Sequence, residues 1–203
     1  MKEYISISRE ILYGVTAYVF DKLDGSNIRA EWSRKKGFHK FGSRNRLIGS
    51  DQPFLPESIP LIQDKYAEDP SRIFKDQRYE SATCFFEFWG ESSFAGYHAE
   101  EPHDVTLFDV SPFKKGFLLP QDFLKLFGEL DIPKLVFQGP ISHPFVDAIQ
   151  DGSIPCSEEG VVCKGAPTKN GYPPMMFKIK TDAWIARLRE KCGDDLNLFE
   201  KLL

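Results

Sequence analysis

The stretch from residue 16 to residue 41 constrains the fold more than any other part of the sequence. Its apolar and polar side chains alternate, and the alternation is broken at Asp24-Gly25 and at Lys36-Gly37. Alternation with a period of two is typical of strands with one buried face, and Gly-containing dipeptides mark tight turns. The first run, Thr16–Lys22, is rich in β-branched and aromatic residues. The stretch therefore predicts two or three strands joined by tight turns.

The remainder of the chain mixes strand and helix patterns in one order. Apolar runs predict further strands at Thr83–Trp89, Val105–Val110, Pro133–Gln138, Gly160–Cys163 and Met175–Ile179. Helical spacing predicts short helices within Glu57–Gln77, interrupted near Asp69-Pro70, and helices at Pro120–Leu130, Pro144–Ile149 and Asp182–Leu203, the last broken at Gly193. This order favours an α+β fold with mostly antiparallel strands. With 203 residues, 41% of them hydrophobic, we expect one domain over 1–203 with a real core.

Several protein classes are excluded by what the sequence lacks. It has no run of about eighteen apolar residues, the length that a membrane-spanning helix needs. Its N-terminus lacks the apolar stretch of a signal peptide. Its four cysteines include no C-x-x-C pair, which favours free thiols over disulfides or a zinc site. We therefore expect a cytoplasmic protein with no membrane contact.

The charge of the chain is unevenly distributed. Seven cations and one acid lie between Arg29 and Arg46, a local charge of +6, which leaves −10 for the remainder of a chain whose net charge is −4. One interpretation is a solvated hairpin with a basic face. The other is a surface that faces phosphates, as in proteins that bind nucleic acid.

The turn after the first predicted strand carries a candidate nucleophile. Lys22 stands two positions before Asp24, and Gly25-Ser26-Asn27 follows directly. A lysine attacks only after it loses its proton, which requires desolvation or a neighbouring cation. Lys178 and Lys180 could supply that cation. Taken alone, a lysine beside an Asp-Gly turn is more often part of a solvated hairpin.

Four further charged residues have an ambiguous setting. Lys178 and Lys180 are two apart in a strand pattern, so they leave one face and repel each other unless an anion lies between them. They could equally be the solvent face of an edge strand. Glu87 lies between two phenylalanines and needs a strong partner, whether in a structural ion pair or as a ligand for ribose or metal. Glu159 starts a strand, where it could bind a divalent cation or belong to an ordinary surface loop.

These segments together resemble a known family. Lys22–Asn27, the strand around Glu87, Glu159–Lys164 and Met176–Thr181 are similar to motifs I, III, IV and V of the covalent nucleotidyltransferases, which include DNA ligases, RNA ligases and capping enzymes. The closest similarity is to the RNA ligase 2-like branch. It is carried by Asn27 after Gly-Ser and by two further segments, one resembling motif Ia with Arg44 and one resembling motif IIIa with Phe108.

The resemblance implies an ATP-grasp-like ligase domain, in which a nucleotide cleft lies between two mostly antiparallel sheets flanked by helices. It implies an ATP-dependent RNA ligase that needs Mg²⁺ or Mn²⁺, forms lysyl-AMP, passes AMP to a 5′-phosphate RNA end and seals it to a 3′-OH, as in RNA repair. The roles implied for individual residues are Lys22 as the nucleophile, Asp21 and Phe108 on the adenine, Arg44 and Glu87 on the ribose or the receiving strand, Asn27 and Lys178 and Lys180 on the phosphates, and Glu159 on the metal.

Some features depart from the family pattern. Phe86 stands where many relatives carry Gly, and Asp24 matches DNA ligases and capping enzymes rather than phage RNA ligases. Few residues follow motif V, so we expect no OB-fold or other C-terminal domain, and a partner protein could replace it. The alternatives are a DNA ligase, a capping-type guanylyltransferase, or a non-catalytic module that binds nucleotides or RNA ends. The expected partner is nucleic acid, either RNA ends or a nicked duplex.

Overall fold

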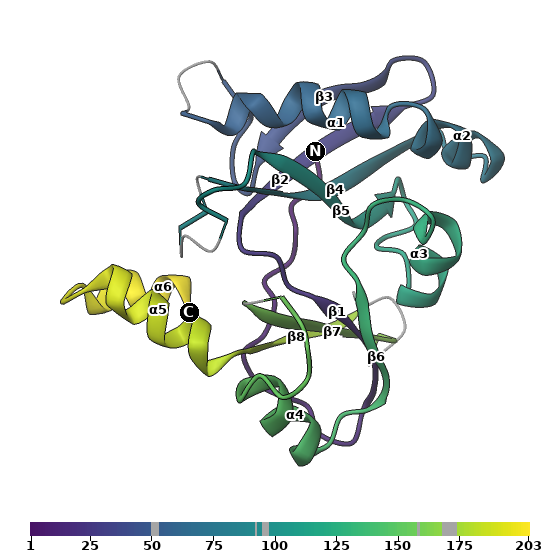
Figure 1. Cartoon of the computed structure of the whole chain (residues 1–203). Coiled ribbons are helices and arrows are strands. Elements are labelled where there is room, and N and C mark those ends of the chain that lie inside the picture. The colour runs from purple at the N-terminus through teal and green to yellow at the C-terminus, as the bar shows by residue number, and fades with distance from the viewer. Residues whose placement is uncertain (50–52, 92, 95–97, 158, 168–173) are drawn as a thin grey trace.

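The structure consists of two four-stranded sheets, one above the other in Figure 1. It is a computed structural model that describes residues 1–49, 53–91, 93–94, 98–157, 159–167 and 174–203. The upper sheet has the order β3 (Gly37–Ser43), β2 (Ser26–Ser33), β4 (Ser81–Trp89) and β5 (Asp104–Pro112). The lower sheet has the order β6 (Leu135–Pro140), β1 (Thr16–Asp21), β7 (Gly160–Gly165) and β8 (Met175–Lys180). Every strand pairing within the two sheets is antiparallel, which confirms the predicted α+β class.

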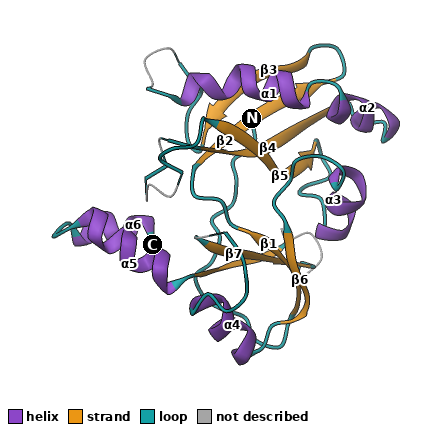
Figure 2. Ribbon diagram, viewed as in Figure 1, coloured by secondary structure: helices purple, strands orange, loops and turns teal. Residues whose placement is uncertain are grey.

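Helices cover the outer faces of both sheets (Figure 2). The helices of the described residues are α1 (Ser58–Tyr66), α2 (Asp69–Asp76), α3 (Pro120–Phe127), α4 (His143–Gln150), α5 (Asp182–Cys192) and α6 (Leu196–Leu202), with a 3-10 turn at Leu55–Glu57. The first three pack on the upper sheet, α4 packs on the lower sheet, and α5 and α6 form a small cluster of their own. The breaks predicted near Asp69-Pro70 and at Gly193 are confirmed. None of the helices in these ranges is long and apolar enough to cross a membrane.

Strand β4 is buried on both faces, which explains why its sequence does not alternate. Phe86 contacts Tyr66 of α1 with ring centroids 5.0 Å apart. Phe85 points to the opposite face and packs against Tyr4, also at 5.0 Å. A strand covered on both sides has a nearly continuous apolar sequence. The predicted loop from Gly165 to Pro174 lies mostly outside the described residues.

The N-terminal segment crosses from one sheet to the other, which the sequence patterns did not predict. The Tyr4 ring packs edge-on against Phe108 of β5, with centroids 5.0 Å apart. The backbone of Ser8 instead joins the lower sheet, where it bridges Phe177 and accepts a hydrogen bond from the Lys178 amide at 3.0 Å. Residues 1–8 therefore connect the two sheets.

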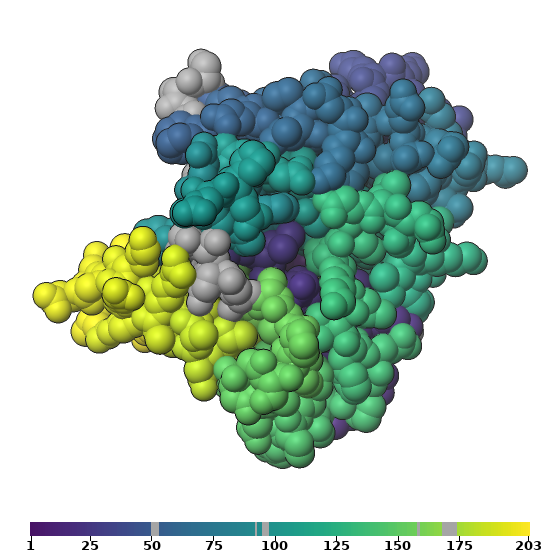
Figure 3. All heavy atoms as spheres, in the orientation of Figure 1, coloured from purple at the N-terminus to yellow at the C-terminus, as the bar shows by residue number. Residues whose placement is uncertain are grey.

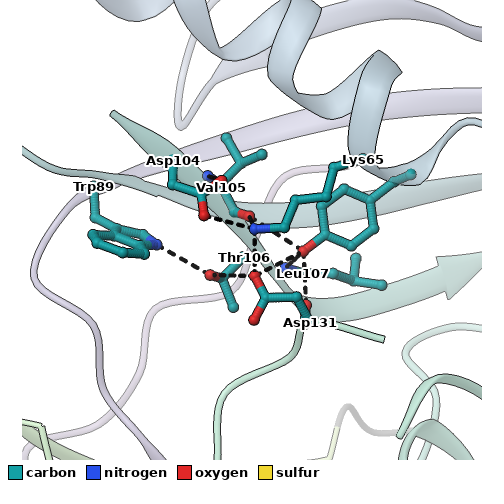
Figure 4. Close-up of polar contacts among 8 residues, drawn as sticks. Lys65, Trp89, Asp104, Val105, Thr106, Leu107 and Asp131 are labelled. Carbon is teal, nitrogen blue, oxygen red and sulfur yellow. Dashed lines mark hydrogen bonds and ion pairs between the residues drawn. The ribbon is translucent and has the colours of Figure 1, made fainter. Parts of the chain in front are cut away.

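A polar cluster attaches the start of β5 to α1 (Figure 4). Lys65 of α1 places its amine 2.7 Å from Asp104 and 2.6 Å from Asp131, which lies on the segment leading to β6. Thr106 donates a hydrogen bond to Asp131 at 3.2 Å and accepts one from the Trp89 indole at 3.0 Å. These bonds hold the ends of β4 and β5 in register.

Candidate active site

A cavity of about 760 Å³ lies between the two sheets. In Figure 3 the molecule is hollowed between its upper and lower parts. Every site residue predicted from the sequence lines this cavity: Asp21, Lys22, Asn27, Arg44, Glu87, Phe108, Glu159, Lys178 and Lys180. Residues that are up to 159 positions apart in sequence are thus brought to one place by the two sheets.

Lys22 is held on the segment that joins the lower sheet to the upper one. The amide of Lys22 donates to the Gly160 carbonyl at 2.9 Å, and the preceding amide of Asp21 donates to Lys134 at 2.9 Å. The turn then passes so close to β4 that a Cβ on Gly25 would lie 2.3 Å from the Phe88 carbonyl oxygen. Only glycine fits this approach. The backbone therefore fixes where the Lys22 side chain enters the cavity.

Glu159 joins two of the lysines. Its side chain is only 5% exposed, with one carboxylate oxygen 2.8 Å from the Lys22 amine and the other 3.1 Å from the Lys180 amine. Burial lowers the pKa of Lys22, but the nearby acidic groups, with Glu159 the largest contributor, outweigh burial and raise this pKa above its usual value. The sequence suggested that neighbouring cations would lower it. In this arrangement the attraction to Glu159 prevails, and Lys22 is held as an ammonium ion.

Lys178 and Lys180 share one face of β8 as predicted, and both side chains reach the cavity. Burial, with repulsion from Lys22 and Arg9, lowers the pKa of Lys178 to about 8. Burial also lowers the pKa of Lys180, to about 7. Attraction to Glu159 opposes this shift, and repulsion from Lys22 and Lys178 adds to it. Cations crowded in this way favour an anionic ligand.

Glu87 reaches the cavity from β4. Burial raises the pKa of its carboxyl group to about 8; attraction to Lys22 opposes this, and repulsion from Glu159 and Asp24 adds to it. The carboxyl group is therefore mostly protonated at neutral pH in the folded chain. A protonated carboxyl group can donate a hydrogen bond, for example to a hydroxyl oxygen of a ribose.

Glu87→Gln should flatten the pH dependence of stability. Between the ordinary pKa of 4.5 and about 8, folded wild type binds a proton on Glu87 that the unfolded chain has lost. The contribution of Glu87 to the free energy of unfolding therefore falls as pH rises across this window, by at most about 1.4 kcal/mol per pH unit. Glutamine has no such proton. Urea unfolding of both proteins from pH 5 to pH 8 measures the difference, and parallel curves would contradict the assignment.

The remaining predicted residues occupy different parts of the cavity. A carboxylate oxygen of Asp21 accepts a hydrogen bond from the Ser157 amide. The main-chain oxygen of Phe108 accepts one from Lys164 at 2.7 Å. Arg44 donates to the Ser6 hydroxyl at 3.2 Å. These contacts hold the three residues at the cavity, and the roles that the resemblance implies for them toward a nucleotide stay predictions.

Asn27 carries an orphaned buried atom. Its side-chain oxygen is buried, and no described residue donates a hydrogen bond to it. Buried polar atoms are nearly always satisfied, so this oxygen beside the cavity is able to accept a hydrogen bond from a ligand or to bind a cation.

The cavity also fits a divalent cation in part. Among the described residues, no three His, Cys, Asp or Glu side chains gather closely enough to hold a metal ion alone. Mg²⁺ is commonly bound by one or two carboxylates together with substrate phosphates, and Glu159 and the Asn27 oxygen offer such ligands. A metal here would therefore share its coordination with a bound phosphate.

The sequence patterns did not identify Lys164 as a residue of the site. It lies 3.1 Å from Asp109, so one buried ion pair joins β7 of the lower sheet to β5 of the upper sheet. The available signal was alternation, because Lys164 shares a face of β7 with Val162 and both line the cavity.

The cations between Arg29 and Arg46, the basic segment of the sequence, do not form one surface in the fold. This corrects their interpretation as a single surface that faces phosphates. Arg29 is 4% exposed and donates to the Ser43 carbonyl at 2.7 Å, because β2 is an interior strand of the upper sheet. Arg44 lies at the cavity. Lys35 and Lys36 lie at the turn between β2 and β3, about 25 Å from the cavity end of the eight-residue β2. Arg29 is therefore structural, and the exposed cations form separate groups.

The fold is similar to that of the RNA ligase of Naegleria gruberi, as seen in several of its solved structures. A ligand-free point mutant of that ligase gives a TM-score of 0.61 at 16% identity, covering 88% of this chain and 52% of the ligase. The ligase with PPi gives a TM-score of 0.61 at 17% identity, covering 88% of this chain and 53% of the ligase. A point mutant with ATP and Mn gives a TM-score of 0.58 at 16% identity, covering 85% of this chain and 51% of the ligase. This chain thus spans about half the length of those ligase chains.

Comparisons of sequence found no counterpart. No protein-family model matches the chain, and no curated protein matches it. At such low identity, the similarity to solved structures concerns the fold alone. The chain has an α+β fold of two four-stranded antiparallel sheets and six helices in its described part, and this fold resembles the nucleotidyltransferase fold of an RNA ligase.

Proposed function

We propose that the chain is an ATP-dependent adenylyltransferase of the RNA ligase type, with Lys22 as its nucleophile. The observation that carries this proposal is the convergence of Lys22, Glu159 and Lys180 in one cavity, together with all the other residues that match the ligase motifs. The fold of an RNA ligase supports it.

In the proposed reaction the Lys22 amine attacks the α-phosphorus of ATP. A nitrogen–phosphorus bond forms, the bond from the α-phosphorus to the bridging oxygen breaks, and pyrophosphate leaves. The amine must first lose a proton, and the Glu159 carboxylate is within hydrogen-bonding reach at 2.8 Å. Lys178 and Lys180 offset negative charge on the phosphates, which is the main catalytic demand in phosphoryl transfer.

A divalent cation held by Glu159 and Asn27 would add a second effect. It would supply electrostatic stabilisation of the phosphates. Its positive charge close to Lys22 would also disfavour the ammonium form and so lower the pKa of the Lys22 amine. The residues of this chain therefore suit a nucleophile that is activated only when substrate binds.

The second half of the proposal concerns RNA. AMP on Lys22 would pass to a 5′-phosphate end, and a 3′-OH would then displace AMP to join two strands. Arg44 lies at the cavity, where an incoming strand would meet the nucleotide. The similarity of the fold to that of an RNA ligase supports RNA ends as the acceptor.

Labelling of the protein should depend on ATP and not on GTP. The expected result is covalent transfer of label from α-labelled ATP in the presence of Mg²⁺ or Mn²⁺, reduced at least about tenfold when α-labelled GTP replaces it. Autoradiography of the denatured protein measures both reactions. Comparable labelling by GTP would favour the capping-type alternative, and no labelling by either nucleotide would favour a non-catalytic binding module.

Charge reversal of Lys35 and Lys36 should weaken RNA joining and spare adenylylation of the protein. These lysines lie at the turn between β2 and β3, far from Lys22, so they can reach only an extended ligand. Each lost phosphate contact should lower the salt dependence of RNA binding by about one unit of slope. Lys114→Glu/Lys115→Glu, at another exposed turn, is the matched control and should leave RNA binding unchanged. Equal losses in both steps would refute an RNA-binding role.

A further inference from the structure

The C-terminal end of α6 lies on the two lysines of β8. Lys178 donates to the Leu203 main-chain oxygen at 2.7 Å, and Lys180 donates to the Leu202 oxygen at 3.0 Å. The last carbonyl oxygens of a helix have no partner within the helix and carry partial negative charge. In Figure 1, α5 and α6 lie side by side at the left of the lower sheet, and the C label stands at the end of this pair nearer to that sheet. The lysines proposed to bind phosphates are therefore already bonded to an internal electronegative group.

Arg9 is a third cation at the same place. It comes from the N-terminal segment, lines the cavity, and matches none of the motifs. Its guanidinium donates to the Glu200 main-chain oxygen and lies 3.4 Å from the Glu200 carboxylate. Segments from both ends of the described chain thus meet at the end of α6, with the cations on one side and the helix carbonyl oxygens on the other.

Lys180 has little capacity for an additional ligand. Its ammonium has three donors, of which one bonds Glu159 and one bonds the Leu202 oxygen. The amine also lies 3.5 Å from the centroid of the Trp184 ring. A phosphate can therefore approach Lys180 closely only if one of these partners moves away.

Helix α6 is the partner that can move most easily. It has seven residues, none of them fully buried, and an isolated helix of that length is marginal in water. It is held by its Asp195 cap and by packing against α5, where the Arg189 guanidinium lies 5.0 Å from the Phe199 ring centroid. Glu159, in contrast, lies at the start of an interior strand and is buried.

We propose that Arg9, Lys178 and Lys180 form one binding site for the outer phosphates of the nucleotide, and that the C-terminal end of α6 occupies this site as an internal competitor. The identification of the ligand as a nucleotide rests on the proposed function above. The competition itself concerns any polyphosphate. Binding would release α6, and mutations that loosen α6 would strengthen binding.

Two proline variants of the whole chain separate this competition from a general loss of structure. Phe199→Pro removes the bond from the Phe199 amide to the Asp195 carbonyl and disrupts α6 without altering a cation. Leu196→Pro places proline at the first helical position, where it is tolerated, and removes only the bond from the Leu196 amide to the Asp194 carbonyl, outside the helix, so it serves as the control. Titration calorimetry with inorganic tripolyphosphate should give a Kd about fivefold or more lower for Phe199→Pro than for wild type, and an unchanged Kd for Leu196→Pro.

Hydrogen exchange gives a second, direct measurement on the wild-type chain. The Leu203 amide bonds the Phe199 carbonyl at 2.8 Å, and tripolyphosphate should accelerate its exchange if α6 is displaced. Slower or unchanged exchange, an unchanged or weaker affinity of Phe199→Pro, or no binding of tripolyphosphate by any variant would each overturn the inference. Formation of lysyl-AMP is assayed in parallel. If tripolyphosphate displaces α6 but no lysyl-AMP forms, only the proposed function is refuted. If lysyl-AMP forms but tripolyphosphate does not displace α6, only this inference is refuted.

Discussion

Lys22→Ala should abolish covalent labelling of the chain by ATP. The Lys22 amine is the candidate nucleophile, and the neighbouring amines of Lys178 and Lys180 are bonded to the end of α6. Removal of a nucleophile leaves no route to the covalent product, so we expect labelling to fall at least about a thousandfold. Intact-mass spectrometry after incubation with ATP and Mg²⁺ or Mn²⁺ measures the loss of the AMP adduct.

The fold should survive this change, which makes the result interpretable. Glu159 keeps Lys180 as a partner at 3.1 Å when Lys22 is absent, so no buried carboxylate is left unpaired. Lys36→Ala, at an exposed turn, is the matched control and should be labelled as fully as wild type. Labelling of Lys22→Ala at the wild-type level would place the nucleophile elsewhere.

Lys178→Ala and Lys180→Ala should each slow adenylylation by about a hundredfold or more. Loss of one positioned donor at a site of developing negative charge costs this much in other enzymes. Their low pKa values add a testable consequence. Because the pKa is about 8 for Lys178 and about 7 for Lys180, phosphate must bind together with protons near neutral pH. Affinity for polyphosphate should therefore fall as pH rises from 7 to 9 in wild type.

Conservative replacements and a surface control sharpen this test. Lys178→Arg and Lys180→Arg should not restore the rate, because a planar guanidinium does not replace a compact ammonium. Lys191→Ala, on the exposed side of α5, should behave as wild type. Normal rates for both alanine variants of β8 would mean that these lysines are only a polar face of the strand.

The positions of the strands and helices could be predicted because local patterns determine them. Alternation identified β1 and β8, and helical spacing identified α3 with its proline at the first turn. The break at Gly193 was predictable because a helix ends readily where glycine adopts a positive φ, here 53°. The gathering of the site residues followed from the order of the motifs and not from any local pattern.

Three features of the site lay beyond local patterns. The pKa of Lys22 depends on Glu87 and Glu159, which are distant in sequence, so its direction could not be deduced. Arg29 was assigned to a basic surface because charge in sequence does not reveal that β2 lies inside its sheet. Arg9 has no motif, and its position depends on an irregular N-terminal segment.

The central claim is that Lys22 becomes covalently linked to AMP. It is tested most directly by incubating the wild-type chain with ATP and Mg²⁺ or Mn²⁺, digesting it, and locating the adduct by tandem mass spectrometry. The account predicts one AMP moiety, linked through a phosphoramidate bond to Lys22. AMP found on another residue, or no adduct with either metal ion, would contradict it.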